Sequence, residues 1–129
     1  MPIIDLIAAL AVTQFLFFGY QVGIQRKNSG LKAPAMTGHE GFERAYRVQM
    51  NTLELLVAFL PVLLLAGKFW PALLVAPLGV IYLVGRMLYW RAYVSNPASR
   101  GLGFMLSLLP IAVLLLLAIL GAVITSLGG

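Results

Sequence analysis

Two rows of polar side chains lie within segments that are otherwise strongly apolar. The first row steps by three, four and three residues and consists of Arg44, Arg47, Asn51 and Glu54. The second row steps by four, three and four residues and consists of Tyr82, Arg86, Tyr89 and Tyr93. At about 100° per residue, each row falls within an arc of about 80° on one face of a helix. We therefore expect two helices whose polar faces meet each other or line a shared cavity.

The charges in these rows indicate a binding site for a small anionic or zwitterionic ligand. Ionisable side chains are costly inside a bilayer and are candidates for function there. The cations outnumber the single acid, Glu54, and comprise Arg44, Arg47, Arg86 and Arg100. Because an unpaired cation is costly in a low dielectric, this excess favours an anion that arrives from outside. The planar fork of arginine suits carboxylates, and Glu54 suits an ammonium group.

The same residues also allow more conservative interpretations. In one, Glu54 pairs with Arg86 or Arg47 in an intramembrane salt bridge that holds the helices together. In another, the remaining basic residues serve only to orient the chain in the membrane, as is expected for Lys27, Lys32 and Arg91. Gln49 points about 180° away from the Arg47 face, which fits a helix–helix hydrogen bond. If Gln49 also reaches the ligand, the ligand must lie between two copies of the chain.

The composition places these rows in a membrane. Of 129 residues, 61% are hydrophobic and 10% are charged, whereas a soluble domain carries about 25% charged residues. This excludes an ordinary soluble protein, a disordered chain and collagen. The chain has no cysteine, so disulfides, protein thiolates and cysteine-bound metals do not enter, and with one histidine and four acids we expect no metal site. The length predicts one domain over residues 1–129.

Four apolar segments are long enough to cross a bilayer, which takes about 20 residues. They run from Ile3 to Ile24, from Gly41 to Ala66, from Pro71 to Val94 and from Leu102 to Leu127. Short connections join antiparallel neighbours, which predicts an all-α, up-down bundle of four transmembrane helices. In the connections, His39 is predicted to be a solvated loop residue. Asn96 is predicted to be an N-cap, with Pro97 as the first helical residue of the last span.

The basic residues are divided unevenly between the two ends of the predicted bundle. Of the nine Lys and Arg residues, Lys68 alone lies at the second connection, and all others border the first or the third. Cytoplasmic loops carry an excess of such residues. We therefore expect an integral, multi-pass membrane protein with extracytoplasmic termini and a site toward the cytoplasmic side.

The segment from Phe42 to Glu54 resembles a known family signature. It reads FERAYRVQMNTLE and meets every fixed position of FERxYRxQxNxxE, the pattern of one branch of the MAPEG superfamily. These are membrane-associated proteins of eicosanoid and glutathione metabolism, and the branch holds leukotriene-C synthases and microsomal glutathione transferases of types 2 and 3. A second block, YLVGRMLYWRAY from Tyr82 to Tyr93, also matches and is followed by Arg100. The chain departs from the family at Leu55, where tyrosine is frequent.

The resemblance implies a homotrimer that binds glutathione, as co-substrate, between neighbouring subunits. By position, one subunit would supply Arg47, Asn51, Glu54, Tyr89, Tyr93 and Arg100, and its neighbour would supply Arg26 and Gln49. Arg100 falls on the family's catalytic arginine, which stabilises the glutathione thiolate, and Tyr89 and Tyr93 stand beside it. The implied reaction is conjugation of glutathione to hydrophobic electrophiles, with reduction of lipid hydroperoxides as a second activity. The implied partners are membrane lipid and hydrophobic or lipid substrates, with no nucleic acid.

Two other functions stay open at this point. A lipid-binding or scaffold member of the same superfamily would lack the catalytic arginine or its geometry, and the presence of Arg100 argues against it. A small multidrug transporter also has four spans, but it exchanges cations with protons at a lone membrane acid. The arginine excess would repel cationic drugs. Calorimetry of the purified protein with glutathione separates these functions.

Overall fold

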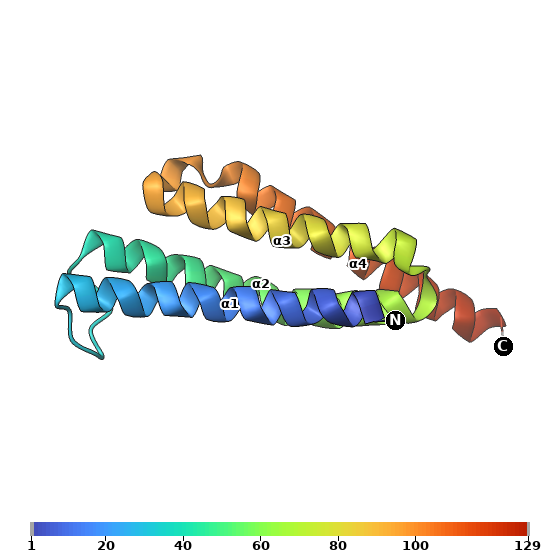
Figure 1. Ribbon diagram of the computed structural model, residues 1–129. Helices are drawn as coiled ribbons and strands as arrows, with labels where there is room; N and C mark the ends of the chain where they lie inside the picture. The colour runs from blue at the N-terminus through green and yellow to red at the C-terminus, as the bar shows by residue number, and fades with distance from the viewer. Residues whose placement is uncertain (1, 129) are drawn as a thin grey trace.

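In the computed structural model, which describes residues 2–128, the chain forms four long helices. Their bounds are α1 Pro2–Ser29, α2 Glu40–Phe69, α3 Ala72–Ser95 and α4 Gly101–Gly128, with a short 3-10 turn, η1, at Pro97–Ser99. All four are long and apolar enough to cross a bilayer. Figure 1 shows that they alternate in direction, with both chain ends at the same end of the bundle as the α2–α3 connection. The predicted four-helix, up-down membrane bundle is confirmed.

Two helix starts differ from the sequence prediction. The side chain of Asn96 accepts a hydrogen bond from the Ala98 amide at 3.2 Å, but it caps η1, and α4 begins only at Gly101. His39 is an exposed loop residue, as predicted, and it is in addition the N-cap of α2. Its Nδ1 accepts a hydrogen bond from the amide of Phe42 at 3.2 Å. The imidazole thereby satisfies one of the amides that a helix start leaves unpaired.

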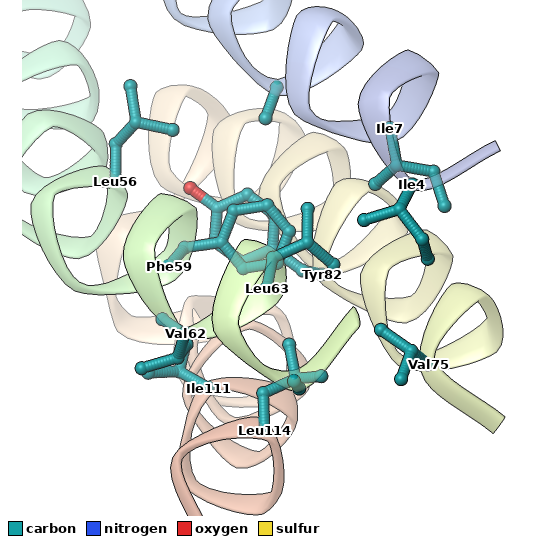
Figure 2. Close-up of a cluster of buried hydrophobic side chains, with 12 residues drawn as sticks. Ile4, Ile7, Leu56, Phe59, Val62, Leu63, Val75, Tyr82, Ile111 and Leu114 are labelled. Atoms are coloured by element: carbon teal, nitrogen blue, oxygen red, sulfur yellow. The ribbon is translucent and has the colours of Figure 1, made fainter. Parts of the chain in front are cut away.

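The main hydrophobic core lies in the half of the bundle nearer the chain ends. Figure 2 shows its side chains, with the rings of Phe59 and Tyr82 stacked at a centroid distance of 3.7 Å. All four helices contribute to the buried cluster, which includes Ile4, Ile7, Leu63, Val75, Ile111 and Leu114. Lipid tails are as apolar as this core, so close packing rather than the hydrophobic effect selects the helix contacts. Packing in this half of the bundle therefore holds the four helices in position relative to one another, including at the polar end.

Two glycines allow α3 and α4 to approach closely next to the polar residues. A Cβ atom added to Gly85 would lie 2.7 Å from the backbone carbonyl carbon of Leu106, and one added to Gly103 would overlap the backbone of Tyr89. Small residues permit such backbone approach between membrane helices. Because α4 is pressed against this part of α3, the approach fixes the positions of Arg86 and Tyr89 relative to the start of α4.

Candidate functional site

A polar pocket lies between α2, α3 and α4, at the end of the bundle that holds η1. Its cavity volume is about 630 Å³. The lining residues are Arg47 and Asn51 from α2, Tyr89 and Tyr93 from α3, and Ala98, Arg100, Gly101, Phe104 and Met105 from η1 and the start of α4. The structure thus brings together five residues that the sequence proposed for one site, namely Arg47, Asn51, Tyr89, Tyr93 and Arg100. Two members of each polar row therefore face a shared cavity, whereas Tyr82 of the second row is buried in the core against Phe59.

The α2 and α3 walls of the pocket differ in their side chains and in how exposed these are. Arg47 is exposed and free to meet a ligand, whereas Asn51, one turn further along α2, is half-buried. The rings of Tyr89 and Tyr93 stack with their centroids 5.6 Å apart. Tyr89 is only 4% exposed, and Tyr93 is half-buried. The aromatic pair forms a packed wall opposite an exposed cation.

Arg100 stands where η1 passes into α4. Its backbone oxygen accepts a hydrogen bond from the amide of Phe104 at 3.0 Å, so Arg100 occupies the cap position of α4. Its Nη1 donates to the carbonyl oxygen of Pro97 at 2.9 Å, and the side chain is otherwise exposed. A helix start carries partial positive charge. The guanidinium and the start of α4 together make this corner of the pocket favourable for an anion.

Arg86 lies directly behind the pocket wall and is fully buried, with 0% of its surface exposed. Its Nε donates to the Ser107 hydroxyl at 2.8 Å, and its Nη1 donates to Oδ1 of Asn51 at 2.8 Å and to the Thr52 hydroxyl at 3.1 Å. All three partners are neutral. The salt bridge between Glu54 and Arg86 or Arg47, left open by the sequence, is therefore wrong for this subunit, since the one ion pair within residues 2–128 joins Arg44 to Glu40.

Arg44 was grouped with the ligand-facing cations, and the structure gives it a different position. Its Nη1 donates to the carbonyl oxygens of Val94 and Ser95 at 3.0 and 3.2 Å. These are carbonyls of the last turn of α3, where a cation is favoured by the helix dipole. Arg44 therefore ties the start of α2 to the end of α3. The pocket is lined by two arginines, Arg47 and Arg100, rather than four.

The acid expected in the cavity, Glu54, does not line it. Glu54 follows Asn51 by one turn of α2 and is exposed. Within the part of the chain that the structure describes, the pocket lining includes no acidic residue. The pocket therefore presents positive charge and hydroxyl groups, and the acid lies outside its lining.

Arg26 and Gln49, which the family pattern assigns to a neighbouring subunit, lie away from this pocket. Gln49 packs against α1, where a Cβ atom added to Gly19 would lie 2.9 Å from its Nε2. The guanidinium carbon of Arg26 lies 4.4 Å from the ring centroid of Phe42, and its Nη1 donates to Ala35 at 2.9 Å. The structure therefore separates the proposed ligand contacts into two groups on different sides of α2.

The apolar part of the pocket was missed from sequence. Phe104 and Met105 line the cavity on α4. Phe104 follows Arg100 by one helical turn, so the helical period from Arg100 would have selected it. The hydroxyls of Thr52 and Ser107 were also missed, and their only sequence signal is their polarity within apolar spans. Phe104 and Met105 give the pocket an apolar side, whereas Thr52 and Ser107 accept hydrogen bonds from Arg86 behind the pocket wall.

Fold and pocket together define a class: a four-span integral membrane protein with an arginine-lined pocket at one end of the bundle. The MAPEG family model matches residues 4–120. The chain belongs to the MAPEG family, and the branch that its sequence resembles is confirmed by its relatives. It is 42% identical over 115 residues to the uncharacterized protein sll1147 of Synechocystis sp., covering 89% of this chain and 84% of that protein.

Two further relatives have assigned names. Microsomal glutathione S-transferase 2 of Homo sapiens is 36% identical over 115 residues, which cover 89% of this chain and 78% of the human protein. Leukotriene C4 synthase of Bos taurus is 33% identical over 94 residues, which cover 73% of this chain and 63% of the bovine protein. The pocket described above lies within residues 4–120, the part of the chain that the family model matches.

Proposed function

We propose that this chain is a membrane-embedded glutathione S-transferase that conjugates glutathione to hydrophobic electrophiles. The observation that carries the proposal is the meeting of Arg47, Arg100 and two tyrosines in one pocket with an apolar side. The human relative, named as a microsomal glutathione S-transferase, supports glutathione as the co-substrate. Family membership supports the membrane as the source of the second substrate.

Glutathione carries two carboxylates, one ammonium group and one thiol, and the pocket offers a group for most of them. Arg47 is exposed at the pocket and binds one carboxylate through its planar fork. The amide of Asn51 donates hydrogen bonds to the peptide part, and the hydroxyl oxygen of Tyr93 accepts one from a peptide N–H. Glu54, just beyond the lining, binds the ammonium group at the rim. In this assignment Glu54 binds the ligand from its exposed position and forms no salt bridge with an arginine.

A second subunit completes the site. Arg26 and Gln49 lie on the α1 side of α2, while Arg47 and Asn51 line the pocket between α2, α3 and α4. Contact of one subunit's α1 side with a neighbour's pocket places Arg26 and Gln49 against the second carboxylate. Repetition of this head-to-tail contact closes a ring, and the ring we propose is a homotrimer with three equivalent sites.

Arg100 supplies the catalytic step. A free cysteine thiol has a pKa of about 8.5, and a nearby cation and a helix start lower it. The bound thiol loses its proton to solvent, and the thiolate attacks an electrophilic carbon held against Phe104 and Met105. A carbon–sulfur bond forms, and the leaving group departs with its electron pair. Tyr89 and Tyr93 line the cavity beside the sulfur and donate hydrogen bonds to the thiolate.

The same thiolate suits a peroxidase reaction. Attack on a lipid hydroperoxide breaks the oxygen–oxygen bond, releases the alcohol and leaves glutathione as its sulfenic acid. A second glutathione then forms the disulfide and releases water. Two glutathione molecules are oxidised for each hydroperoxide reduced, so the reaction needs no metal or other reductant.

The orientation of the site in the membrane follows from the basic residues. The α1–α2 loop and η1 lie at one end of the bundle, and the chain ends lie at the other (Figure 1). The pocket includes Ala98 of η1 and therefore lies at the first of these ends. Lys and Arg residues border the pocket end. We propose that this end is cytoplasmic and that the termini are extracytoplasmic.

An activity screen tests the proposed function. Purified protein is assayed with glutathione plus an aryl halide, and separately with glutathione plus a lipid hydroperoxide. The matched control is Arg91→Ala. Arg91 is an exposed arginine, like Arg100, but it lies on α3 and lines a separate groove between α1 and α3. We expect Arg91→Ala to retain activity and Arg100→Ala to lower turnover at pH 7, by about threefold from the change in thiol pKa alone. Absence of glutathione binding by calorimetry would refute the transferase, whereas binding without turnover would favour the scaffold function.

A further inference from the structure

We propose that Arg86 is a positioning residue for this pocket, which holds Asn51 and Tyr89 in the orientation that receives glutathione. The proposal rests on the proposed function and extends it to a residue that touches no ligand. Arg86 is the largest fully buried side chain of the described chain, and its hydrogen bonds reach α2 and α4 from α3. It therefore links the three helices that line the pocket.

The contact with Asn51 fixes the direction of an amide. A guanidinium has only donors, so the Asn51 atom that meets Nη1 at 2.8 Å must be the oxygen. The two amide hydrogens of Asn51 then point away from Arg86. Since Asn51 lines the pocket, these donors are available to an acceptor on the ligand. Without Arg86, the amide is free to rotate and present either end.

The contact with Tyr89 fixes the aromatic wall. The guanidinium carbon of Arg86 lies 4.3 Å from the centroid of the Tyr89 ring, within the range of a cation–π contact. Tyr89 also stacks on Tyr93, with 5.6 Å between centroids. One buried side chain thus contacts both the amide of Asn51 on α2 and the ring of Tyr89 on α3.

The charge of Arg86 is not balanced by any acid among residues 2–128. Its three hydrogen-bond partners are neutral, and its Nη2 is buried with no hydrogen-bond partner in the described structure. Such a cation is costly inside a bilayer. An anion bound on the other side of Asn51 and Tyr89 offsets part of this cost. A residue present only for packing would not need this charge.

A double-mutant cycle on glutathione affinity tests the proposal. Asn51→Ala is expected to weaken binding about fivefold, the usual effect of one lost hydrogen bond. Arg86→Met is expected to weaken binding about tenfold, because both walls lose their support. If Arg86 acts through Asn51, the double variant binds about as weakly as Arg86→Met alone. Independent effects would multiply to about fiftyfold, and that result would overturn the proposal.

Conservative variants separate positioning from charge and from folding. Arg86→Lys keeps the cation but cannot bond Ser107, Asn51 and Thr52 together, so we expect it to weaken binding as well, though less than Arg86→Met, which also loses the charge. If Arg86→Met does not fold, Ser107→Ala loosens the guanidinium and keeps the charge. It should weaken glutathione binding about threefold, while the matched control on the same helix, Ser126→Ala, should bind normally.

The outcomes distinguish this proposal from the proposed function. If wild-type protein binds no glutathione, both are overturned. If wild-type protein binds glutathione but the Arg86 variants lose only thermal stability, with unchanged affinity in the folded fraction, Arg86 is structural and only this proposal fails. Normal affinity in both Ser107→Ala and Arg86→Lys would also overturn it.

Discussion

The sharpest prediction concerns the division of roles between Arg47 and Arg100. Arg100 stands at the cap of α4, where its charge adds to the helix start, whereas Arg47 lies on α2 across the pocket. We expect Arg100 to act on the sulfur and Arg47 to act on a carboxylate. Arg100→Ala should therefore raise the pKa of the bound thiol toward its free value of about 8.5, with a smaller loss of affinity. Arg47→Ala should do the reverse.

The magnitudes follow from the ionisation of the thiol. A lowering of about two pKa units corresponds to about 2.7 kcal/mol. At pH 7, loss of that stabilisation reduces the thiolate fraction about 25-fold. A more basic thiolate is also more nucleophilic, with a Brønsted coefficient of about 0.4–0.5, which restores about eightfold. Turnover at pH 7 should thus fall about threefold from this effect alone, so the pH profile is more diagnostic than a single rate.

The test measures two quantities for each variant. Ultraviolet titration gives the pKa of the bound thiol, and calorimetry gives the dissociation constant for glutathione. In wild-type protein the thiolate should be present below pH 7 and disappear as the pH falls through the lowered pKa. In Arg100→Ala it should appear only near pH 8.5. Arg47→Ala should keep the low thiol pKa and weaken binding by about 1.5–3 kcal/mol, the usual effect of a hydrogen bond to a charged group.

Two results would refute this reasoning. An Arg100→Ala protein that keeps a low thiol pKa and normal turnover would remove Arg100 from the catalytic step. Equal loss of affinity in both variants, with no change in thiol pKa, would show that both arginines bind carboxylates. If both residues only orient the chain in the membrane, expression should fall while the kinetics of correctly inserted protein stay unchanged.

Three further predictions concern assembly, topology and packing. Native mass spectrometry in mild detergent should show trimers, and monomers or dimers alone would argue against a site shared between subunits. A C-terminal reporter that is active only in the cytoplasm should be silent, and a bright reporter would reverse the proposed orientation. Gly103→Ala should destabilise the protein by about 1–3 kcal/mol and weaken glutathione binding, because its Cβ meets the backbone of Tyr89. Gly128→Ala, which has open space around it, should match wild type in thermal unfolding.

The sequence was sufficient to predict the spans and the polar rows because both depend on local rules. Apolar length fixes a span, and the helical period decides which residues share a face. Arg47, Asn51, Tyr89 and Tyr93 could therefore be assigned to one cavity before the structure was known. Arg100 lies outside both rows, and only the family pattern placed it beside them.

The partners of the other arginines could not be predicted because they depend on tertiary proximity. Arg44 bonds the last carbonyls of α3, and backbone carbonyls carry no sequence signature. Arg86 bonds hydroxyls on two other helices, and a lone Thr52 or Ser107 looks the same whether it faces lipid or an arginine. Charge counting favoured Glu54 as a partner, since it weighs only charged groups. In the structure, Arg86 instead donates hydrogen bonds to the neutral oxygens of Asn51, Thr52 and Ser107.

The pocket is divided between two helical hairpins, and this has a consequence for biogenesis. Helix α1 packs mainly on α2, and α3 packs mainly on α4, as Figure 1 also shows. Arg47 and Asn51 belong to the first hairpin, whereas the tyrosines and Arg100 belong to the second. A nascent chain released into the bilayer with only its first hairpin therefore has no functional pocket. Ligand binding becomes possible only after the second hairpin is inserted and docked, so ligand binding indicates completed assembly. If the chain is divided near Trp70 and the two halves are produced together, they should regain ligand binding.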